Sequence, residues 1–256
     1  MIVVRLAMSY DVVDLRDFYA QRLGTVARRF VGRGIRARWA DTRGQRVLGV
    51  GYATPYLGLF REEAERCLAF MPAVQGVVKW PSANPTLTAL VDEYELPLAD
   101  SSVDRVLLVN ALEMSHDVTT LLREVWRVLA GSGRLMAVVP NRRGLWARID
   151  TTPFGHGRPY SRSQITQLLR ETWFTPTSWG EALYVPPVSR GWFLRAAVAW
   201  ERTGATISAP FAGVHIVEAT KQVYRAIPAR REKRRLVPGL APVLEPVLTP
   251  STGQAG

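Results

Sequence analysis

The stretch SVDRVLLVNALEMSHDVTTLLREVWRVLAGSGRLMAVVP, residues 102–140, decides the fold class of this chain. It begins with an apolar run from Asp104 to Val109, which has the composition of a buried strand. Apolar residues then recur at helical spacing over 118–129, and Gly131-Ser132-Gly133 is expected to end this helix. A second apolar run follows over 134–139. Strand, helix and strand in this order predict a parallel pair joined by a crossover helix.

The same alternation extends on both sides of this unit. Before it, the pattern predicts basic amphipathic helices within 11–39, a strand over 47–51, a helix from an N-cap at Thr54 to just before Pro72, and strands over 74–79 and 86–91. After it, the pattern predicts a helix opened by a capping box at Ser161–Gln164, strands near 173–185 and 213–221, and an aromatic helix near 190–203. The expected fold is α/β: a Rossmann-like, mostly parallel seven-stranded sheet with helices on both faces, forming three layers.

One large domain is expected, with an addition at each end. Residues 1–40 read as an N-terminal basic helical extension, and 41–225 as the Rossmann-like domain. Residues 226–256 are basic and then rich in proline, a composition typical of disorder.

Cysteine and hydropathy bound the cellular context. Cys67 is the only cysteine, so no disulfide can form within the chain, and no His/Cys cluster has zinc spacing. No apolar run approaches the ~20 residues of a membrane span, and the first residues are too briefly apolar for a signal peptide. The sequence favours a cytoplasmic protein.

Charge is distributed unevenly along the chain. The net charge is +11, and arginines cluster near both ends. Such clusters suit nucleic acid or an anionic membrane surface, or they are simply a solvated basic face. No nucleic-acid motif accompanies them, so nucleic acid is disfavoured while peripheral membrane contact stays open. Acidic residues gather instead over 92–117, which predicts a local acidic cleft for a cationic ligand.

Two segments carry a resemblance to a known family. Residues 92–106 read DEYELPLADSSVDRV, and residues 121–135 read LLREVWRVLAGSGRL. The first is similar to the "DAExLPFxDxSFDxV" stretch, and the second to the "LxExxRVLxPGGxL" stretch, of class I methyltransferases of the type-11 group. These enzymes use S-adenosyl-L-methionine (SAM) as cofactor. The resemblance implies SAM as the cofactor here and says little about the methyl acceptor.

The resemblance also implies cofactor-binding positions. Asp92 would contact the adenine amino group with Glu93 beside it, and Asn110-Ala111-Leu112 would line the sulfonium end of SAM. The alternative for Asp92 is a carboxylate that caps its own loop. The loop after the first strand, with Gly49, Gly51, Tyr52 and Ala53, would approach the amino-acid tail of the cofactor.

This loop departs from the family pattern of an acid followed by Gly-x-Gly-x-Gly. The acid is absent, and Ala53 and Pro55 stand where glycines are usual. The acid that grips the ribose at the end of the second strand is also missing, and Lys79 is expected at that place. Losing one charge-assisted pair weakens binding by ~10–100-fold, which does not abolish it.

The loop over 141–160 is expected to form the acceptor side of the pocket. Candidate catalytic residues are His116, His156 and Tyr160, and candidate acceptor-binding residues are Asn141, Arg142, Trp146 and Arg158. Alternatives stay open: His116 as a surface residue at a helix start, and Trp146 packed in the core. His215 lies in an apolar run and is expected to be a packed strand residue. No metal site is expected.

Three functions follow, in order of preference. The first is a SAM-dependent methyltransferase acting on a small-molecule or lipid-like acceptor. The second is a catalytically silent protein with the methyltransferase fold that serves binding or assembly, favoured by the altered loop at 49–55. The third is a domain that binds an anionic nucleotide such as NADP, which Lys79 would suit, although the pyrophosphate glycines are missing.

Overall fold

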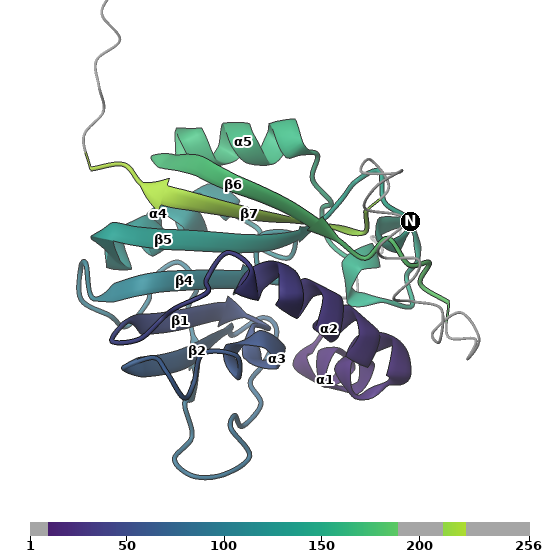
Figure 1. Cartoon of the computed structure of the whole chain (residues 1–256), viewed down its shortest axis with the longest axis horizontal. Coiled ribbons are helices and arrows are strands. Elements are labelled where there is room, and N and C mark those ends of the chain that lie inside the picture. Colours follow the sequence, from purple (N-terminus) through teal and green to yellow (C-terminus); the bar gives the residue numbers. More distant parts are fainter. Residues whose placement is uncertain (1–9, 189–211, 224–256) are drawn as a thin grey trace, which may run out of the picture. The chain divides into compact units, whose positions relative to one another are not determined.

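The computed structural model describes residues 10–188 and 212–223 (Figure 1). The longer helices and strands, in chain order, are α1 (Val12–Ala20), α2 (Arg22–Arg36), β1 (Arg46–Gly51), α3 (Thr54–Leu57), β2 (Arg66–Pro72), β3 (Thr88–Val91), β4 (Val103–Val109), α4 (Val118–Val128), β5 (Leu129–Pro140), α5 (Arg162–Glu171), β6 (Phe174–Ala182) and β7 (Val214–Lys221). The predicted helix near 190–203 lies outside the described residues, and the division into domains stays a prediction.

The strands form one seven-stranded sheet in the order β3-β2-β1-β4-β5-β7-β6. Strands β1 to β5 pair in parallel, and β7 runs antiparallel to both β5 and β6. The strand order reverses between β1 and β4, whose ends pair at Gly51 and Val109. Ligands of open α/β sheets bind beside the carboxyl ends of the strands at such a switch point. The predicted fold class is confirmed.

Alternating residues of the strands enter two separate cores. On one face, apolar side chains of α1, α2 and α3 pack against Val47, Leu107 and Val109. On the other face, α4 and α5 pack against Val106 and Leu108. Figure 1 shows α2 and α3 in front of the sheet, with α4 behind it. The helices on both faces give the three layers, and none of those described is long and apolar enough to cross a membrane.

Helix α4 shows how the sequence sets an element. Asp117 caps it by accepting from the backbone N–H groups of Thr119 and Thr120. Its buried residues are Leu121, Leu122, Val125 and Val128. The chain turns directly from Val128 into β5, whose range includes Gly131-Ser132-Gly133. The prediction that these glycines end the helix is therefore wrong, because strand pairing with β4 begins already at Leu129.

The observed secondary structure differs most from the predicted one over residues 54–79. The long helix predicted from Thr54 is a single turn, α3, whose N-cap position is Ala53 rather than Thr54 and which has no side-chain cap. Residues 66–72 form β2, which is paired on both sides, and 74–79 form no strand. A short apolar run fits a helix or a buried strand equally well, so only its neighbours in the sheet decide. Cys67 lies on this strand, and burial raises the pKa of its thiol to about 12.

Candidate active site

The loop after β1 is built around two glycines. Gly51 has φ +80°, and a Cβ there would lie 2.3 Å from the carbonyl oxygen of Val109. Gly49 lets Ala53 and Leu57 of the following turn pack against β1, because a Cβ would lie 2.6 Å from that of Ala53. Ala53 has φ −83°, so its methyl group causes no backbone strain. The replacement of a family glycine by Ala53 is therefore compatible with this loop.

Lys79 does not occupy the ribose position. β2 ends at Pro72, and the exposed Lys79 bonds through Nζ to Oδ1 of Asn84, at 2.9 Å, in the loop before β3. The prediction that placed Lys79 at the end of the second strand is wrong, since that strand is 66–72. The residues that end β2 and follow it are Met71, Pro72 and Ala73, so a carboxylate is absent there too.

Asp92 and Glu93 follow β3 at the same edge of the sheet. Oδ1 of the exposed Asp92 accepts from the backbone N–H of Tyr94 at 2.8 Å, so Asp92 caps its own loop, which was the alternative to a cofactor role. This bond leaves Oδ2 on the solvent side available to a ligand. Glu93 is buried and accepts from the hydroxyl of Ser115 at 2.7 Å. This bond ties the loops after β3 and β4 together.

Asn110 and Glu113 lie directly after β4. Asn110 has φ +49° and is fully buried, and its Nδ2 donates to Oε1 of Glu113 at 3.1 Å. Oδ1 of Asn110 and Oε2 of Glu113 are buried without any hydrogen-bond partner. Burial raises the pKa of Glu113 to about 7. Buried polar atoms are nearly always hydrogen-bonded, so two unsatisfied acceptors here indicate a place for a donor.

The two unsatisfied hydrogen-bond acceptors of Asn110 and Glu113 show whether the residues at this edge suit SAM. SAM carries an ammonium and a sulfonium group, both cationic. The edge between β1 and β4 offers a buried carboxyl and a buried amide oxygen, and Gly51 lets the two strand ends approach closely. The residues present therefore fit the cofactor. Sequence reasoning missed Glu113, although a carboxylate three residues after Asn110 at a strand end was a readable signal.

Helix α1 covers this edge. The backbone N–H of Val12 donates to the carbonyl of Gln75 at 2.8 Å, and Gln75 donates to the carbonyl of Asn110. Tyr19 stacks on Tyr52, with ring centroids 5.7 Å apart, and its hydroxyl lies 3.1 Å from that of Tyr56. Burial raises the pKa of Tyr19 and that of Tyr56. Figure 1 shows α1 at this end of the sheet.

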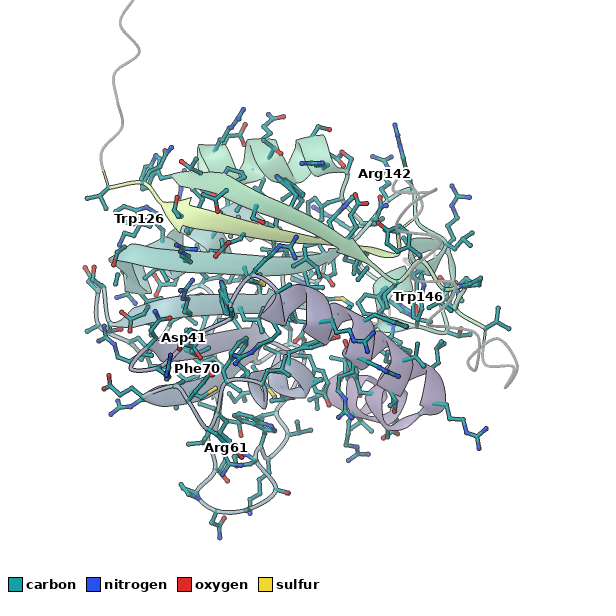
Figure 2. All side chains as sticks on the ribbon, in the orientation of Figure 1. Asp41, Arg61, Phe70, Trp126, Arg142 and Trp146 are labelled. Atoms are coloured by element: carbon teal, nitrogen blue, oxygen red, sulfur yellow. The ribbon has the colours of Figure 1, made fainter. Side chains whose placement is uncertain are left out.

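The loop after β5 contributes both scaffold and surface. Trp146 is fully buried in the core and donates from Nε1 to the carbonyl of Val185 at 2.7 Å. Asn141 is buried and donates to the carbonyl of Ala212. Arg142 and Arg158 are exposed, and Figure 2 shows Arg142 at the periphery.

No contact between any two of the three candidate catalytic residues is observed among the described residues, and two of them contact other parts of the structure. The ring of His156 lies 2.6 Å, through Nε2, from the carbonyl of Asp150. Tyr160 donates to the carbonyl of Leu112 at 3.2 Å and lies close enough to Glu113 for that carboxylate to raise its pKa. His116 is exposed, with no contact to the other two given by the structure. His215 lies buried on β7, as predicted.

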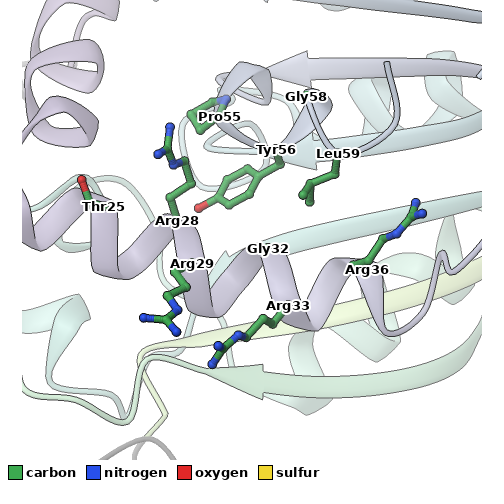
Figure 3. A pocket seen from close by; sticks show the side chains of 10 residues that line it. All are labelled: Thr25, Arg28, Arg29, Gly32, Arg33, Arg36, Pro55, Tyr56, Gly58 and Leu59. Carbon is green, nitrogen blue, oxygen red and sulfur yellow. The ribbon is translucent and has the colours of Figure 1, made fainter. Parts of the chain in front are cut away.

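Cavities lined by described residues include two that do not contain Asn110 or Glu113. A groove of about 590 Å³ between α2 and α3 has Tyr56 and Leu59 on one side and Arg28, Arg29 and Arg33 on the other (Figure 3). A smaller cavity of about 320 Å³ is lined by residues that include Asn141, Arg143, Glu181 and His215. Within the described ranges, no group of three or more His, Cys, Asp or Glu residues is placed to hold a metal ion.

Comparison with known proteins gives this architecture its class. Residues 31–137 match the family model described as a methyltransferase domain. This range contains β1 to β4, α4 and the acceptors at Asn110 and Glu113. This part of the chain is therefore similar to a methyltransferase domain, and the whole sheet has the fold of class I SAM-dependent methyltransferases.

A curated relative bears the name of a SAM-dependent methyltransferase, and solved structures share the fold. A Mycobacterium tuberculosis protein named "Probable S-adenosylmethionine-dependent methyltransferase" is 42% identical over 74 residues, 28% of this chain and 27% of that protein. The match thus spans about a quarter of that relative's length. A Burkholderia thailandensis 1,6-didemethyltoxoflavin-N1-methyltransferase, solved with its substrate and S-adenosylhomocysteine, is 18% identical over 84% of each chain (TM-score 0.52). The [4+2]-cyclase SpnF is 19% identical over 76% of this chain and 80% of its own (TM-score 0.54).

Proposed function

We propose that this chain is a SAM-dependent methyltransferase that acts on a small-molecule acceptor. The observation that carries the proposal is the pair of unsatisfied buried acceptors on Asn110 and Glu113, at the point where β1 and β4 diverge. A stable fold seldom buries such atoms without use, and this edge is where open α/β sheets bind ligands. The methyltransferase-domain match over the same residues supports the proposal, and the curated relative's name points to SAM as the cofactor.

Bound SAM would supply an electrophilic methyl group. The chain would hold and orient both reactants, because methyl transfer needs mainly alignment of the acceptor with the methyl group. Asp92 would bind the adenine through its solvent-side oxygen, and Gly51 and Tyr52 would border the amino-acid tail. The loop over 141–160 would border the acceptor, with Asn141, Arg142 and Arg158 as its polar contacts and Trp146 as support from the core.

A base is needed only where the acceptor is weakly acidic. His156 and Tyr160 lie on the acceptor loop, and His116 lies on the loop after β4, so each is within the region proposed for the acceptor. Burial raises the pKa of Tyr160 to about 12, which makes its hydroxyl a proton donor in hydrogen bonds near neutral pH rather than a base. The proposal therefore gives Tyr160 a positioning role and leaves proton removal to a histidine.

Titration calorimetry with SAM and with S-adenosylhomocysteine tests the proposal. We expect both to bind, with dissociation constants in the tens to hundreds of micromolar, because the loop and ribose acids are absent. If neither compound binds at millimolar concentration, the methyltransferase proposal is overturned.

The alternative, a catalytically silent protein with the methyltransferase fold, has its own support. SpnF is a [4+2]-cyclase by name although it shares this fold, so the fold alone does not fix methyl transfer. The packing of α1 over the strand ends also favours a closed domain. Failure to bind SAM together with a stable, well-packed chain would establish this alternative.

The proposal also extends to where the protein works. The exposed Arg28, Arg29 and Arg33 on α2 line one side of the groove in Figure 3, and the apolar Leu59 lines the other. Arginine above an apolar floor suits a headgroup with phosphate or carboxylate. This supports peripheral contact with an anionic membrane surface and a lipid-like acceptor. The location would be cytoplasmic, in keeping with the free buried thiol of Cys67.

A further inference from the structure

We infer that Asn110 and Glu113 form a buried subsite for a primary ammonium group, the α-ammonium of the methionine part of SAM, with Glu113 replacing the acid missing from the loop after β1. This inference rests on the proposed function and assigns one contact within it. It explains how a chain that lacks two of the family's acids could still hold a cationic cofactor.

The first argument is the number and kind of unsatisfied atoms. Oδ1 of Asn110 and Oε2 of Glu113 are both acceptors, both buried and both without a partner. The bond from Asn110 Nδ2 to Glu113 Oε1 fixes the two side chains relative to each other. An ammonium group has three donors and can satisfy two neighbouring acceptors at once. A neutral acceptor or a second carboxylate would satisfy neither.

The second argument is the position relative to the glycine loop. A Cβ on Gly51 would lie 2.9 Å from the Cβ of Ala111 and 3.2 Å from the backbone carbon of Asn110. The end of β1 therefore touches the turn that carries the subsite. If the loop after β1 meets the amino-acid tail of the cofactor, as the resemblance implies, the ammonium group of that tail comes within reach of this turn.

The third argument is charge. The structure gives Glu113 no ion pair within the described residues, and the groups that face it are Asn110 of its own turn, Tyr19 of α1 and Tyr160 of the acceptor loop. Arg158 reaches Glu113 only through its backbone N–H, which donates to the Glu113 carbonyl at 2.9 Å. A buried carboxyl without a cation is stable when protonated, and it ionises when a cation arrives.

The test compares three ligands that differ in their cationic groups, and the third of them lacks the whole amino-acid part. SAM has the ammonium and the sulfonium, S-adenosylhomocysteine keeps only the ammonium, and 5′-methylthioadenosine has neither. Calorimetry is done with the wild type and with Glu113→Gln. We expect the variant to bind SAM and S-adenosylhomocysteine about 10- to 100-fold more weakly, by a similar factor for each, and 5′-methylthioadenosine unchanged.

Other outcomes are equally informative. A loss for SAM alone would place Glu113 at the sulfonium, and unchanged affinity for all three ligands would remove it from the cofactor site; either result overturns the inference while leaving the proposed function standing. A wild type that binds none of the ligands overturns both. Glu95→Gln is the matched control, because it removes an exposed carboxylate from the same acidic stretch, and it should change affinity less than about twofold.

A second measurement needs no variant. At pH 6 the ammonium is charged and Glu113 is largely protonated, so binding should release close to one proton per S-adenosylhomocysteine. Proton release is measured by repeating the titration in buffers of different ionisation enthalpy. Release in the wild type and its disappearance in a folded Glu113→Gln variant support the subsite. Binding without release in the wild type would overturn it.

Discussion

Asn110 donates from Nδ2 to one oxygen of the Glu113 carboxyl at 3.1 Å, while the other oxygen of that carboxyl is buried with no partner at all. This pair, with one of its two carboxyl oxygens bonded, lies where the strand order of the sheet reverses. Helix α1 and the loop after β5 cover it. A protein does not gain stability from such an arrangement, since an unsatisfied buried acceptor costs about 1–3 kcal/mol. The cost is understandable if the pair serves a ligand.

The ligand-free protein should lose stability as the pH rises through the range in which Glu113 loses its proton. Burial raises the pKa of Glu113 from 4.5 to about 7, so between these values the folded state holds a proton that the unfolded state has released. Stability therefore falls from pH 4.5 to about 7 and is then level, by up to about 3 kcal/mol. Glu113→Gln should remove this decline and be more stable than the wild type at pH 8. Urea denaturation of the wild type and the variant at pH 5 and pH 8 measures the free energy of unfolding; a difference between the two proteins that is the same at both pH values would contradict the prediction.

The role of Asp92 can be separated from its loop cap. Asp92→Asn keeps an oxygen that accepts from the N–H of Tyr94 but loses the charge, whereas Asp92→Ala loses both. If Asp92 binds the adenine amino group, both variants should weaken SAM binding, the alanine variant by about tenfold or more. Binding lost only in the alanine variant would show that the cap alone matters.

The effect on SAM affinity of adding an acid for the ribose should depend on the position of that acid. Lys79→Glu changes a residue in the loop before β3 and should leave SAM affinity unchanged within about twofold, as expected for an exposed charge away from the site. Ala73→Glu adds a carboxylate just beyond the end of β2 and should tighten binding by about tenfold. Calorimetry of the two variants side by side decides; tighter binding by Lys79→Glu would refute the placement.

The loop over 141–160 should contribute little to the stability of the fold and more to turnover of the methyl acceptor. Tyr160→Phe loses the bond to the Leu112 carbonyl, and His156→Ala loses the contact with the Asp150 carbonyl. Each should cost about 1 kcal/mol, lowering Tm by roughly 2–4 °C. Both should keep SAM affinity and lose turnover once an acceptor is found. A fall in Tm beyond about 10 °C would assign the loop to the scaffold.

Membrane contact should depend on the α2 arginines and on salt. Arg28→Glu combined with Arg33→Glu reverses two exposed charges on the groove, while Arg43→Glu reverses one that pairs with Asp41 elsewhere. The fraction of protein that sediments with phosphatidylserine vesicles at 0.05 M salt should fall several-fold for the double variant. It should change little for the control. Binding to uncharged vesicles of similar strength would argue against an electrostatic contact.

The sequence alone determined the fold class, because long periodic segments carry their own signal. The helix α4 and the strand β4 were readable from their apolar spacing, and the Ser161–Gln164 capping box marks a helix start through local hydrogen bonds. The altered glycine loop was readable too, since its meaning lies in residue type.

Tertiary structure alone decided the rest. Residues 66–72 became a strand because β1 and β3 flank them, which removed Lys79 from the site. Whether Trp146 lined a pocket or packed in the core depended on a partner, Val185, that is distant in sequence. The unsatisfied oxygens of Asn110 and Glu113 emerged only after folding, because burial and the absence of a partner are properties of the surroundings and not of the residues themselves.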